Sequence, residues 1–351
     1  MTLQKYNNIL VVRTDRMGDV VLTTPAIEAL KVAYPHARIT LMVSPSTKDL
    51  VSENPFLDEL IIDDRKKKYK GLKGFIKLIH FLRQKKFDLA IIYHTKRRFN
   101  LACFLAGIPN RVGYKNDKLG ILLTNPIKDT RHEGKKHESQ YCLDVLEILG
   151  ITTREGKLHV STTKESDLWM EEYLRQNQIA DKDFLIGVHP GASDPSRHWP
   201  AHRFNELIDI LIEKYQCKVI ILGGPDVVSV SSTIKSSLRN SAFVYDVTGK
   251  TSLHQFGSVL KRCNLFISND SGPVHVAAAV GTPVVAIFTR NQPGINPERW
   301  RPLSRNSKVV SVSPEQSNLS FKKSGKAPAQ YLDLISTETV LEAVDAIYKL
   351  C

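Results

Sequence analysis

Cysteine is scarce in this chain of 351 residues, and long apolar segments are missing. The five cysteines show no Cys-x-x-Cys spacing and no cluster with histidine, which argues against a zinc or iron–sulfur centre and for reduced thiols. No apolar run approaches the roughly 18 residues of a membrane-spanning helix. Ile9–Val12 is too short for the core of a signal peptide. We therefore expect a cytoplasmic protein with no metal site and no cofactor.

Two glycine-rich nucleotide-binding motifs are also missing. No Gly-x-Gly-x-x-Gly follows the first predicted strand, Ile9–Val12, and the chain has no Gly-x-x-x-x-Gly-Lys-Ser/Thr. A nicotinamide-dependent oxidoreductase and a P-loop NTPase are therefore disfavoured. Other nucleotides stay open, because open α/β sheets bind ligands at the carboxyl ends of their strands without these motifs.

Positive charge is abundant and unevenly placed. The chain has 49 Lys+Arg against 36 Asp+Glu, a net charge of +13. Residues 1–165 hold 29 basic and 18 acidic side chains, whereas residues 166–351 hold 20 and 18. Within 65–136 the count is 20 basic to 4 acidic. An anionic partner (nucleic acid, a membrane surface or a phosphorylated substrate) is thus expected at the first half.

Short apolar runs alternate with helical patterns along the whole chain, which predicts an α/β protein with parallel sheets. The rhythm restarts after a helical stretch at 164–178, so we expect two α/β domains, 1–165 and 166–335, and a terminal helix, 336–351. Strands are predicted at 9–12, 39–43, 60–62, 89–93, 184–188, 218–222, 243–247, 265–268 and 284–288.

Ser268–His275 has the pattern of an anion site, in which a strand leads into the N-terminus of a helix. Asp270, Ser271, Gly272 and Pro273 lie between a buried strand and a small-residue helix. Exposed N–H groups and the positive helix end suit a pyrophosphate, although Ser271 could simply cap the helix. A neighbouring carboxylate repels phosphate but binds sugar hydroxyls, so Asp270 points to a nucleotide sugar.

A second loop, 188–200, leaves another predicted strand end. Ser193 can donate a hydrogen bond, and Arg197 brings a fixed charge suited to phosphate. Asp246 ends the strand at 243–247, where it could accept from ribose hydroxyls or merely form a turn.

Asp19 lies in a glycine-containing loop that is predicted to precede a helix at 20–33. It could cap that helix, or serve as the single reachable carboxylate that a general base requires. Gly18 beside it, together with Lys96, Arg97 and Arg98 after another strand, form the candidate acceptor-binding set.

The basic stretch 65–86 carries apolar residues at helical spacing, including Leu72, Phe75, Ile76, Ile79 and Leu82. It could be an interfacial membrane helix, but it leads directly into the strand at 89–93. Packing of its apolar face on the sheet is therefore favoured. The lysines stay outside in both cases and could attract an anionic leaflet or substrate.

Three ordered motifs resemble glycosyltransferase family 9, the ADP-heptose:lipopolysaccharide heptosyltransferases. They are Ile9–Pro25, His189–Ser193 with Arg197–Pro200, and Ser268–Ala279 with Gly281–Val285. The resemblance extends from Ile9 to Pro302. It implies a GT-B fold, in which two Rossmann-like domains with parallel sheets face each other across a cleft.

The resemblance also implies an inverting, metal-independent transfer of heptose from ADP-L-glycero-D-manno-heptose to the lipopolysaccharide inner core. Asp19 would be the general base, and the acceptor would bind the N-terminal domain. The C-terminal domain would bind the donor: Arg197 and the helix end at Ser271, Gly272 and Pro273 would meet the diphosphate, Asp270 the heptose, and Asp246 the ribose. His275 falls on the motif's histidine, where packing is the other possibility.

The expected partners are therefore ADP-heptose and the lipopolysaccharide core, with peripheral contact to the cytoplasmic face of the anionic inner membrane. Another acceptor or another donor sugar stays open within the family. A basic nucleic-acid-binding protein is the alternative from another class. The chain lacks a recognisable recognition helix, zinc finger or aromatic-basic platform, so no nucleic-acid partner is expected.

Overall fold

The computed structural model describes residues 5–153, 156–317 and 333–350, and it separates into two compact units, Met1–His159 and Val160–Cys351. The division falls shortly before the expected boundary at 165. Part of the expected second domain, 318–332, lies outside the described residues. So does Cys351, the last residue of the expected terminal helix.

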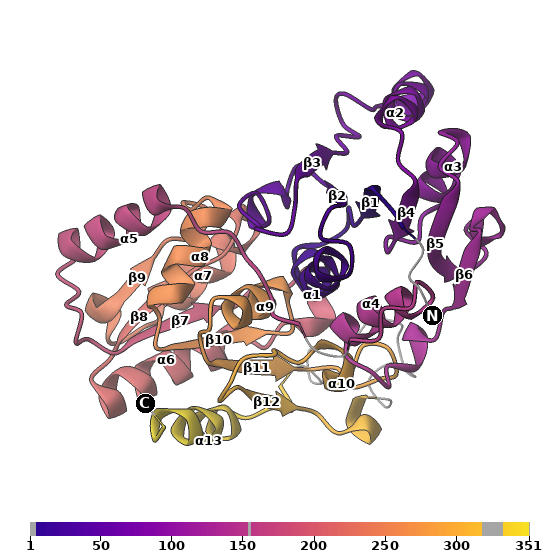
Figure 1. Ribbon diagram of the computed structural model, residues 1–351. Helices are drawn as coiled ribbons and strands as arrows, with labels where there is room; N and C mark the ends of the chain where they lie inside the picture. The colour runs from indigo at the N-terminus through magenta and orange to yellow at the C-terminus, as the bar shows by residue number, and fades with distance from the viewer. Residues whose placement is uncertain (1–4, 154–155, 318–332, 351) are drawn as a thin grey trace. The chain divides into compact units, whose positions relative to one another are not determined.

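The N-terminal unit is built on a six-stranded parallel sheet in the order β3-β2-β1-β4-β5-β6 (Figure 1). In the register of the central strands, Ile9 pairs with Ile39 of β2 and with Leu89 of β4. The strands are β1 (Asn8–Val12), β2 (Arg38–Val43), β3 (Glu59–Ile62), β4 (Leu89–Ile92), β5 (Asn110–Lys115) and β6 (Asn125–Lys128).

Helices cover both faces of this sheet because alternate strand residues point to opposite sides. Leu10, Val12 and Ile92 share a buried cluster with Leu78 and Leu82. That cluster lies under α2 and α3, which pack side by side, as do α1 and α4 (Figure 1). The helices and turns are α1 (Met17–Ala33), α2 (Gly71–Lys85), α3 (Arg97–Leu105), α4 (Glu138–Glu147), η1 (Lys48–Leu50), η2 (Gly120–Leu122) and η3 (Arg131–Glu133).

The C-terminal unit repeats the plan in a second six-stranded parallel sheet, ordered β12-β11-β10-β7-β8-β9. Ile267 of β10 pairs with Val188 of β7 and with Val285 of β11. The strands are β7 (Leu185–His189), β8 (Lys218–Ile221), β9 (Val244–Asp246), β10 (Leu265–Asn269), β11 (Val284–Phe288) and β12 (Lys308–Ser311).

Local sequence signals start several helices of this unit. Thr163 with Ser166, and Ser252 with Gln255, form reciprocal capping boxes before α5 and α8. The elements are α5 (Lys164–Gln176), α6 (Ala201–Tyr215), α7 (Val228–Ser236), α8 (Leu253–Arg262), α9 (Gly272–Ala279), α10 (Pro297–Trp300), α13 (Thr337–Tyr348), η4 (Pro195–Arg197), η5 (Pro225–Val227) and η6 (Ser241–Phe243).

Each sheet reverses its strand order once, and the reversal fixes where a ligand can bind. In the order typical of doubly wound folds, the two strands at the reversal send their following segments to opposite faces, which opens a crevice at their carboxyl ends. The reversal lies between β1 and β4 in the N-terminal unit, and between β7 and β10 in the C-terminal unit. Among the described residues, no helix is both long and apolar enough to cross a membrane.

Two expectations about helices need correction. The first helix begins at Met17 rather than Val20, so Gly18 and Asp19 lie in its first turn and not in a loop. The apolar residues of α2 do not all pack on the sheet. Leu78 and Leu82 are buried, whereas Leu72 and Ile76 are 75% and 57% exposed.

Candidate active site

In the N-terminal unit, a buried arginine organises the β1 end of the reversal. Arg13 follows β1 and is only 1% exposed. Its guanidinium contacts three carboxylates: Asp15 Oδ1 at 3.2 Å, Asp19 Oδ1 at 2.7 Å and Glu138 Oε1 at 2.9 Å. Burial lowers the pKa of Arg13, but the surrounding anionic groups, led by Asp15 and Asp19, raise it well above its usual value. Arg13 is therefore a permanent cation inside the unit.

Asp19 is held by this arginine rather than serving as a helix cap. The N-cap position of α1 is Arg16, whose side chain makes no capping hydrogen bond. Arg13 Nη2 donates to the Asp19 carboxylate, and Arg13 Nε donates to the Asp19 carbonyl at 3.2 Å. The Asp19 side chain keeps 19% of its surface exposed, whereas Glu138 on the same arginine keeps 1%. Asp19 is thus both fixed in direction and open to solvent.

A neutral histidine lies at the β4 end of the same reversal. His94 is buried, and its Nδ1 lies 2.8 Å from Thr14 Oγ1. Burial, followed by the charges of Lys96 and Arg13, lowers the pKa of His94 to about 3. The imidazole is therefore uncharged at neutral pH and can exchange a hydrogen bond without adding to the local positive charge.

The three predicted acceptor-binding cations do not behave alike. Lys96 and Arg97, at the start of α3, are exposed. Arg98 instead makes contacts within its own unit. Its Nη2 donates to the Tyr69 carbonyl at 3.2 Å and lies 3.4 Å from Asp63 Oδ1. Gly18 is buried in the first turn of α1.

In the C-terminal unit, two arginines lie near each other, Arg197 in the loop after β7 and Arg290 after β11. Arg197 Nη1 lies 3.6 Å from Asp270 Oδ2, and Arg290 Nη1 lies 3.1 Å from Asp194 Oδ2. Within the described part of the chain, Arg197 Nε and both Nε and Nη2 of Arg290 are buried without a hydrogen-bond partner. Buried polar groups are nearly always paired. These guanidinium groups are therefore set up to receive an anion.

The charges in this cluster also favour binding of an anion. Burial lowers the pKa of Arg290, and the neighbouring positive charge of Arg197 lowers it further. Burial raises the pKa of Asp270, while Arg197 and Arg290 pull it down. Because two positively charged guanidinium groups lie close together with little access to water, binding of an anion between them is favoured. A phosphate group would supply that charge and bidentate acceptors for guanidinium.

The α9 terminus lies next to this cluster in the chain. Ser271 occupies the N-cap position, but its side chain makes no capping bond; its Oγ lies 3.2 Å from Ser268 Oγ. Gly272 and Pro273 open the helix at the β10 end; Pro273 has no N–H, and Val274 N donates to the Ser271 carbonyl at 3.2 Å. The simple capping alternative for Ser271 is thus not what the structure contains. His275 is buried within α9, with its ring 6.3 Å from that of Trp300.

Asn269, which sequence reasoning missed, ties the 190–199 loop to β10. Its fully buried Nδ2 donates to the Pro190 carbonyl at 2.7 Å, and its Oδ1 accepts from Trp199 N at 3.0 Å. The loop that carries Arg197 is therefore fixed at both ends. Ser193, on the same loop, is exposed.

Asp246 lies apart from the arginine cluster on the edge strand β9. Its Oδ1 accepts from Thr248 N at 2.9 Å and from Thr248 Oγ1 at 2.8 Å, while its Oδ2 accepts from Ser231 Oγ at 2.8 Å. Burial opposes these bonds, yet the Thr248 and Ser231 donors keep the pKa of Asp246 below its usual value. Asp246 is an ionised carboxylate that shapes its own turn.

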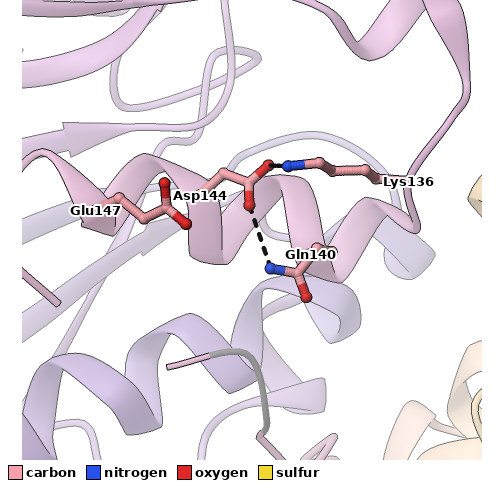
Figure 2. Close-up of a pocket in the computed structure, with 4 residues that line it drawn as sticks. All are labelled: Lys136, Gln140, Asp144 and Glu147. Carbon is pink, nitrogen blue, oxygen red and sulfur yellow. Dashed lines mark hydrogen bonds and ion pairs between the residues drawn. The ribbon is translucent and has the colours of Figure 1, made fainter. Parts of the chain in front are cut away.

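A surface pocket on α4 involves none of the predicted site residues. It is lined by Lys136, Gln140, Asp144 and Glu147 (Figure 2). Lys136 Nζ and Gln140 Nε2 bond to the Asp144 carboxylate at 2.6 and 3.2 Å. Lys136 and Gln140 are both bonded to Asp144, and we assign the pocket no ligand.

The comparisons with known proteins define the family. The model of glycosyltransferase family 9 (heptosyltransferase) matches residues 75–329. The chain belongs to this family and is a glycosyltransferase, as the three motifs predicted.

The curated relatives cover nearly the whole chain. Lipopolysaccharide heptosyltransferase 2 of Escherichia coli K12 is 26% identical over 97% of this chain and 98% of its own length. Lipopolysaccharide heptosyltransferase 3 of the same strain is 28% identical over 94% of this chain and 95% of its own length.

The solved structures agree on the fold. A family 9 glycosyl transferase from Veillonella parvula superposes with a TM-score of 0.88 at 27% identity, over 100% of this chain and 99% of its own. The structure of ADP-heptose lipopolysaccharide heptosyltransferase II of E. coli superposes with a TM-score of 0.79 at 23% identity, over 98% of this chain and 99% of its own. The predicted α/β class and GT-B fold are confirmed.

Proposed function

We propose that this enzyme transfers heptose from ADP-L-glycero-D-manno-heptose to the inner core of lipopolysaccharide with inversion at the anomeric carbon. The observation that carries the proposal is the pair of arginines, Arg197 and Arg290, whose buried nitrogen donors have no partner in the described part of the chain, beside the α9 terminus. A diphosphate leaving group needs such fixed positive charge, because negative charge develops on it as the bond to the sugar breaks.

Inversion requires a single displacement. An acceptor hydroxyl oxygen forms the bond to the anomeric carbon, the bond from that carbon to the β-phosphate oxygen breaks, and ADP departs with the electron pair. The hydroxyl proton passes to Asp19, whose carboxylate Arg13 orients. A positioned general base of this kind contributes about 10²- to 10⁴-fold.

The donor contacts divide along the C-terminal unit. Arg197, Arg290, Ser271 and Gly272 bind the diphosphate, with Pro273 starting the helix that presents the N–H groups. Asp270 accepts from heptose hydroxyls. Asp246 accepts from the ribose with the one lone pair of Oδ2 that Ser231 leaves over, since each carboxylate oxygen accepts twice and Oδ1 already accepts both Thr248 donors.

The remaining residues have supporting or acceptor roles. Ser193 and His275 complete the donor side. On the N-terminal unit, exposed Lys96 and Arg97 meet the anionic groups of the core, and Gly18 lets the acceptor approach Asp19. Arg98 acts through Asp63 and the Tyr69 carbonyl, as a support for that surface. The enzyme works without a metal in the cytoplasm, at the inner face of the inner membrane.

The test is transfer from ADP-heptose to defined truncated lipopolysaccharides, with products identified by mass spectrometry. Asp19→Asn should lower turnover by at least about 10²-fold while ADP affinity, measured by calorimetry, stays unchanged. Asp15→Asn is the matched control, because Asp15 is a carboxylate on the same arginine. Near-normal turnover of Asp19→Asn would exclude the base assignment. Transfer only from another sugar nucleotide, or to another acceptor, would exclude the substrates.

A further inference from the structure

The exposed face of α2 combines aliphatic side chains with a high density of lysine. Leu72 and Ile76 lie one turn apart on the helix and are 75% and 57% exposed. Residues four apart are neighbours on a helix surface, so the two side chains form one apolar ridge. Single exposed apolar residues are common, but such a ridge on a highly charged helix needs a partner.

Lysines surround this ridge, and carboxylates are absent from it. No acidic residue occurs between Arg65 and Phe87. The exposed lysines on α2 and the segment before it are Lys66, Lys67, Lys68, Lys70, Lys73 and Lys77. We call these lysines, together with Leu72 and Ile76, the α2 surface.

The lysine segment is ordered against the helix rather than loose. Lys66 N and Lys67 N both donate to Asp64 Oδ1, at 3.1 and 2.9 Å. The Lys68 ammonium lies 5.1 Å from the centre of the Phe81 ring. A Cβ on Gly74 would lie 2.3 Å from the Tyr69 carbonyl carbon, so the glycine lets the segment pack directly on α2.

The opposite face of α2 is anchored in the core of the unit. Leu78 and Leu82 are buried in the cluster under α2 and α3, and Phe75 and Ile79 pack against its edge. The helix thus cannot turn its lysines away, and the two aliphatic side chains remain in solvent. The two alternatives drawn from the sequence do not exclude each other: one face of α2 packs on the core, and the other is exposed.

We propose that the α2 surface docks the enzyme on an anionic phospholipid bilayer, with Leu72 and Ile76 entering the boundary between headgroups and acyl chains. Clusters of four to eight basic residues on an amphipathic helix have the charge complementarity that such a surface demands. A helix of this kind lies in the plane of the interface with its apolar side chains a few ångströms deep.

A nucleic-acid partner fits the same charge less well. Single strands are bound by stacking on exposed aromatic side chains, and Phe75 and Phe81 of α2 are instead packed against the core. Leu72 and Ile76 would gain nothing from a phosphate backbone. The apolar ridge therefore selects the bilayer over the polynucleotide.

This inference identifies the surface that makes the membrane contact of the proposed function. It depends on the proposed function in one respect only, namely that the acceptor is anchored in a lipid bilayer. The experiment is sedimentation of the full-length protein with vesicles of phosphatidylglycerol and phosphatidylethanolamine, compared with vesicles of phosphatidylcholine alone. We expect binding to the anionic vesicles only. Leu72→Gln with Ile76→Gln should weaken it by at least about ten-fold. Lys73→Gln with Lys77→Gln should weaken it about five-fold per lysine.

Matched variants control for the chemistry of the changes. Val32→Gln with Leu168→Gln also removes two exposed aliphatic side chains, and Lys182→Gln with Lys308→Gln removes two exposed lysines. Both should bind vesicles like the wild type. Circular dichroism and thermal midpoint should be unchanged in all four variants, since the replaced side chains are exposed.

Several outcomes would overturn the inference. They are equal binding to both vesicle types, wild-type vesicle affinity after loss of Leu72 and Ile76, or tighter binding of duplex RNA or DNA that the aliphatic variant leaves intact. Transfer to a water-soluble core oligosaccharide should be equal in wild type and α2 variants. If vesicle binding occurs but no acceptor is glycosylated, the proposed function fails while the docking surface stands.

Discussion

Arg290 follows β11, and its guanidinium has two buried nitrogen atoms without partners among the described residues. We predict that Arg290→Met weakens ADP binding about ten- to hundred-fold, because a hydrogen bond to a charged group contributes about 1.5–3 kcal/mol. The thermal midpoint without ligand should not fall, since the variant removes a buried charge next to Arg197. Calorimetry and a thermal melt test both points.

The control for this change is Arg305→Met, which removes an exposed arginine of the same unit. Its ADP affinity should equal that of the wild type. Unchanged ADP affinity in Arg290→Met would mean that the unpaired donors serve no diphosphate.

His94 predicts a pH dependence of stability. Its folded-state pKa of about 3 lies below the unfolded value of 6.5, so between these values the unfolded chain binds a proton that the folded chain does not. Stability therefore falls as pH falls through this range, and His94 alone should account for about 2 kcal/mol between pH 7 and pH 5. In His94→Gln the free energy of unfolding, from urea titrations, should decline less steeply with acidity. His80→Gln, at an exposed histidine, should keep the wild-type slope. An equally steep decline in His94→Gln would contradict the assignment.

Some residues of the candidate site could be found from the sequence, and others could not. Arg197, Asp270 and Ser271 follow strand ends in recognisable motifs. Arg290 and His94 also follow strand ends, so the same rule could have found them. Glu138 could not be found in this way, because it lies 125 residues from Arg13 and only the fold brings the two side chains together.

At the scale of elements, Gly74 offers a test in which two effects have opposite signs. Alanine in the middle of a helix is favoured over glycine by about 1 kcal/mol, but a Cβ here would overlap the Tyr69 backbone. We predict that Gly74→Ala lowers the free energy of unfolding by about 1–3 kcal/mol, as overpacking does. Urea denaturation measures it, with Gln84→Ala at an exposed position of α2 as control. A more stable Gly74→Ala variant would show that the Tyr69 backbone shifts at little cost to make room for the Cβ.

Nine of the described strands were predicted, including the edge strands β3 and β9, whereas the interior strand β5 and the edge strands β6 and β12 were missed. β1, β2, β7, β10 and β11 are buried on both faces, so each reads as a continuous apolar run. β6 and β12 are mostly exposed, with sequences Asn-Pro-Ile-Lys and Lys-Val-Val-Ser. These two edge strands are held by backbone bonds to one neighbour, and their exposed sequences leave little apolar pattern to detect.

At the scale of the whole molecule, each unit has a sheet and a buried core of its own. We predict that thermal unfolding proceeds in two steps, and that ADP shifts only the step of the C-terminal unit. At a ligand concentration of 100 times Kd, the shift corresponds to about 2.7 kcal/mol. Calorimetry combined with hydrogen exchange should place the added protection in residues 160–317. Protection confined to residues 5–153 would contradict the assignment of the donor site.

The uneven charge of the chain also belongs to this scale. The first half carries nearly all of the net +13, and much of it is concentrated on the α2 surface and the adjoining α3 terminus. Composition alone left nucleic acid, membrane and phosphorylated substrate open. The exposed aliphatic ridge, visible only in the structure, is the observation on which we propose the membrane as a partner.

The sharing of Arg13 by three carboxylates has a consequence for turnover. In the proposed mechanism Asp19 loses its charge when it takes up the acceptor proton, and a lone ion pair would then leave a buried cation without a partner. Asp15 and Glu138 would still lie against the Arg13 guanidinium at that moment. A base at Asp19 could therefore gain and release a proton in every turnover without leaving Arg13 as an unpaired buried cation.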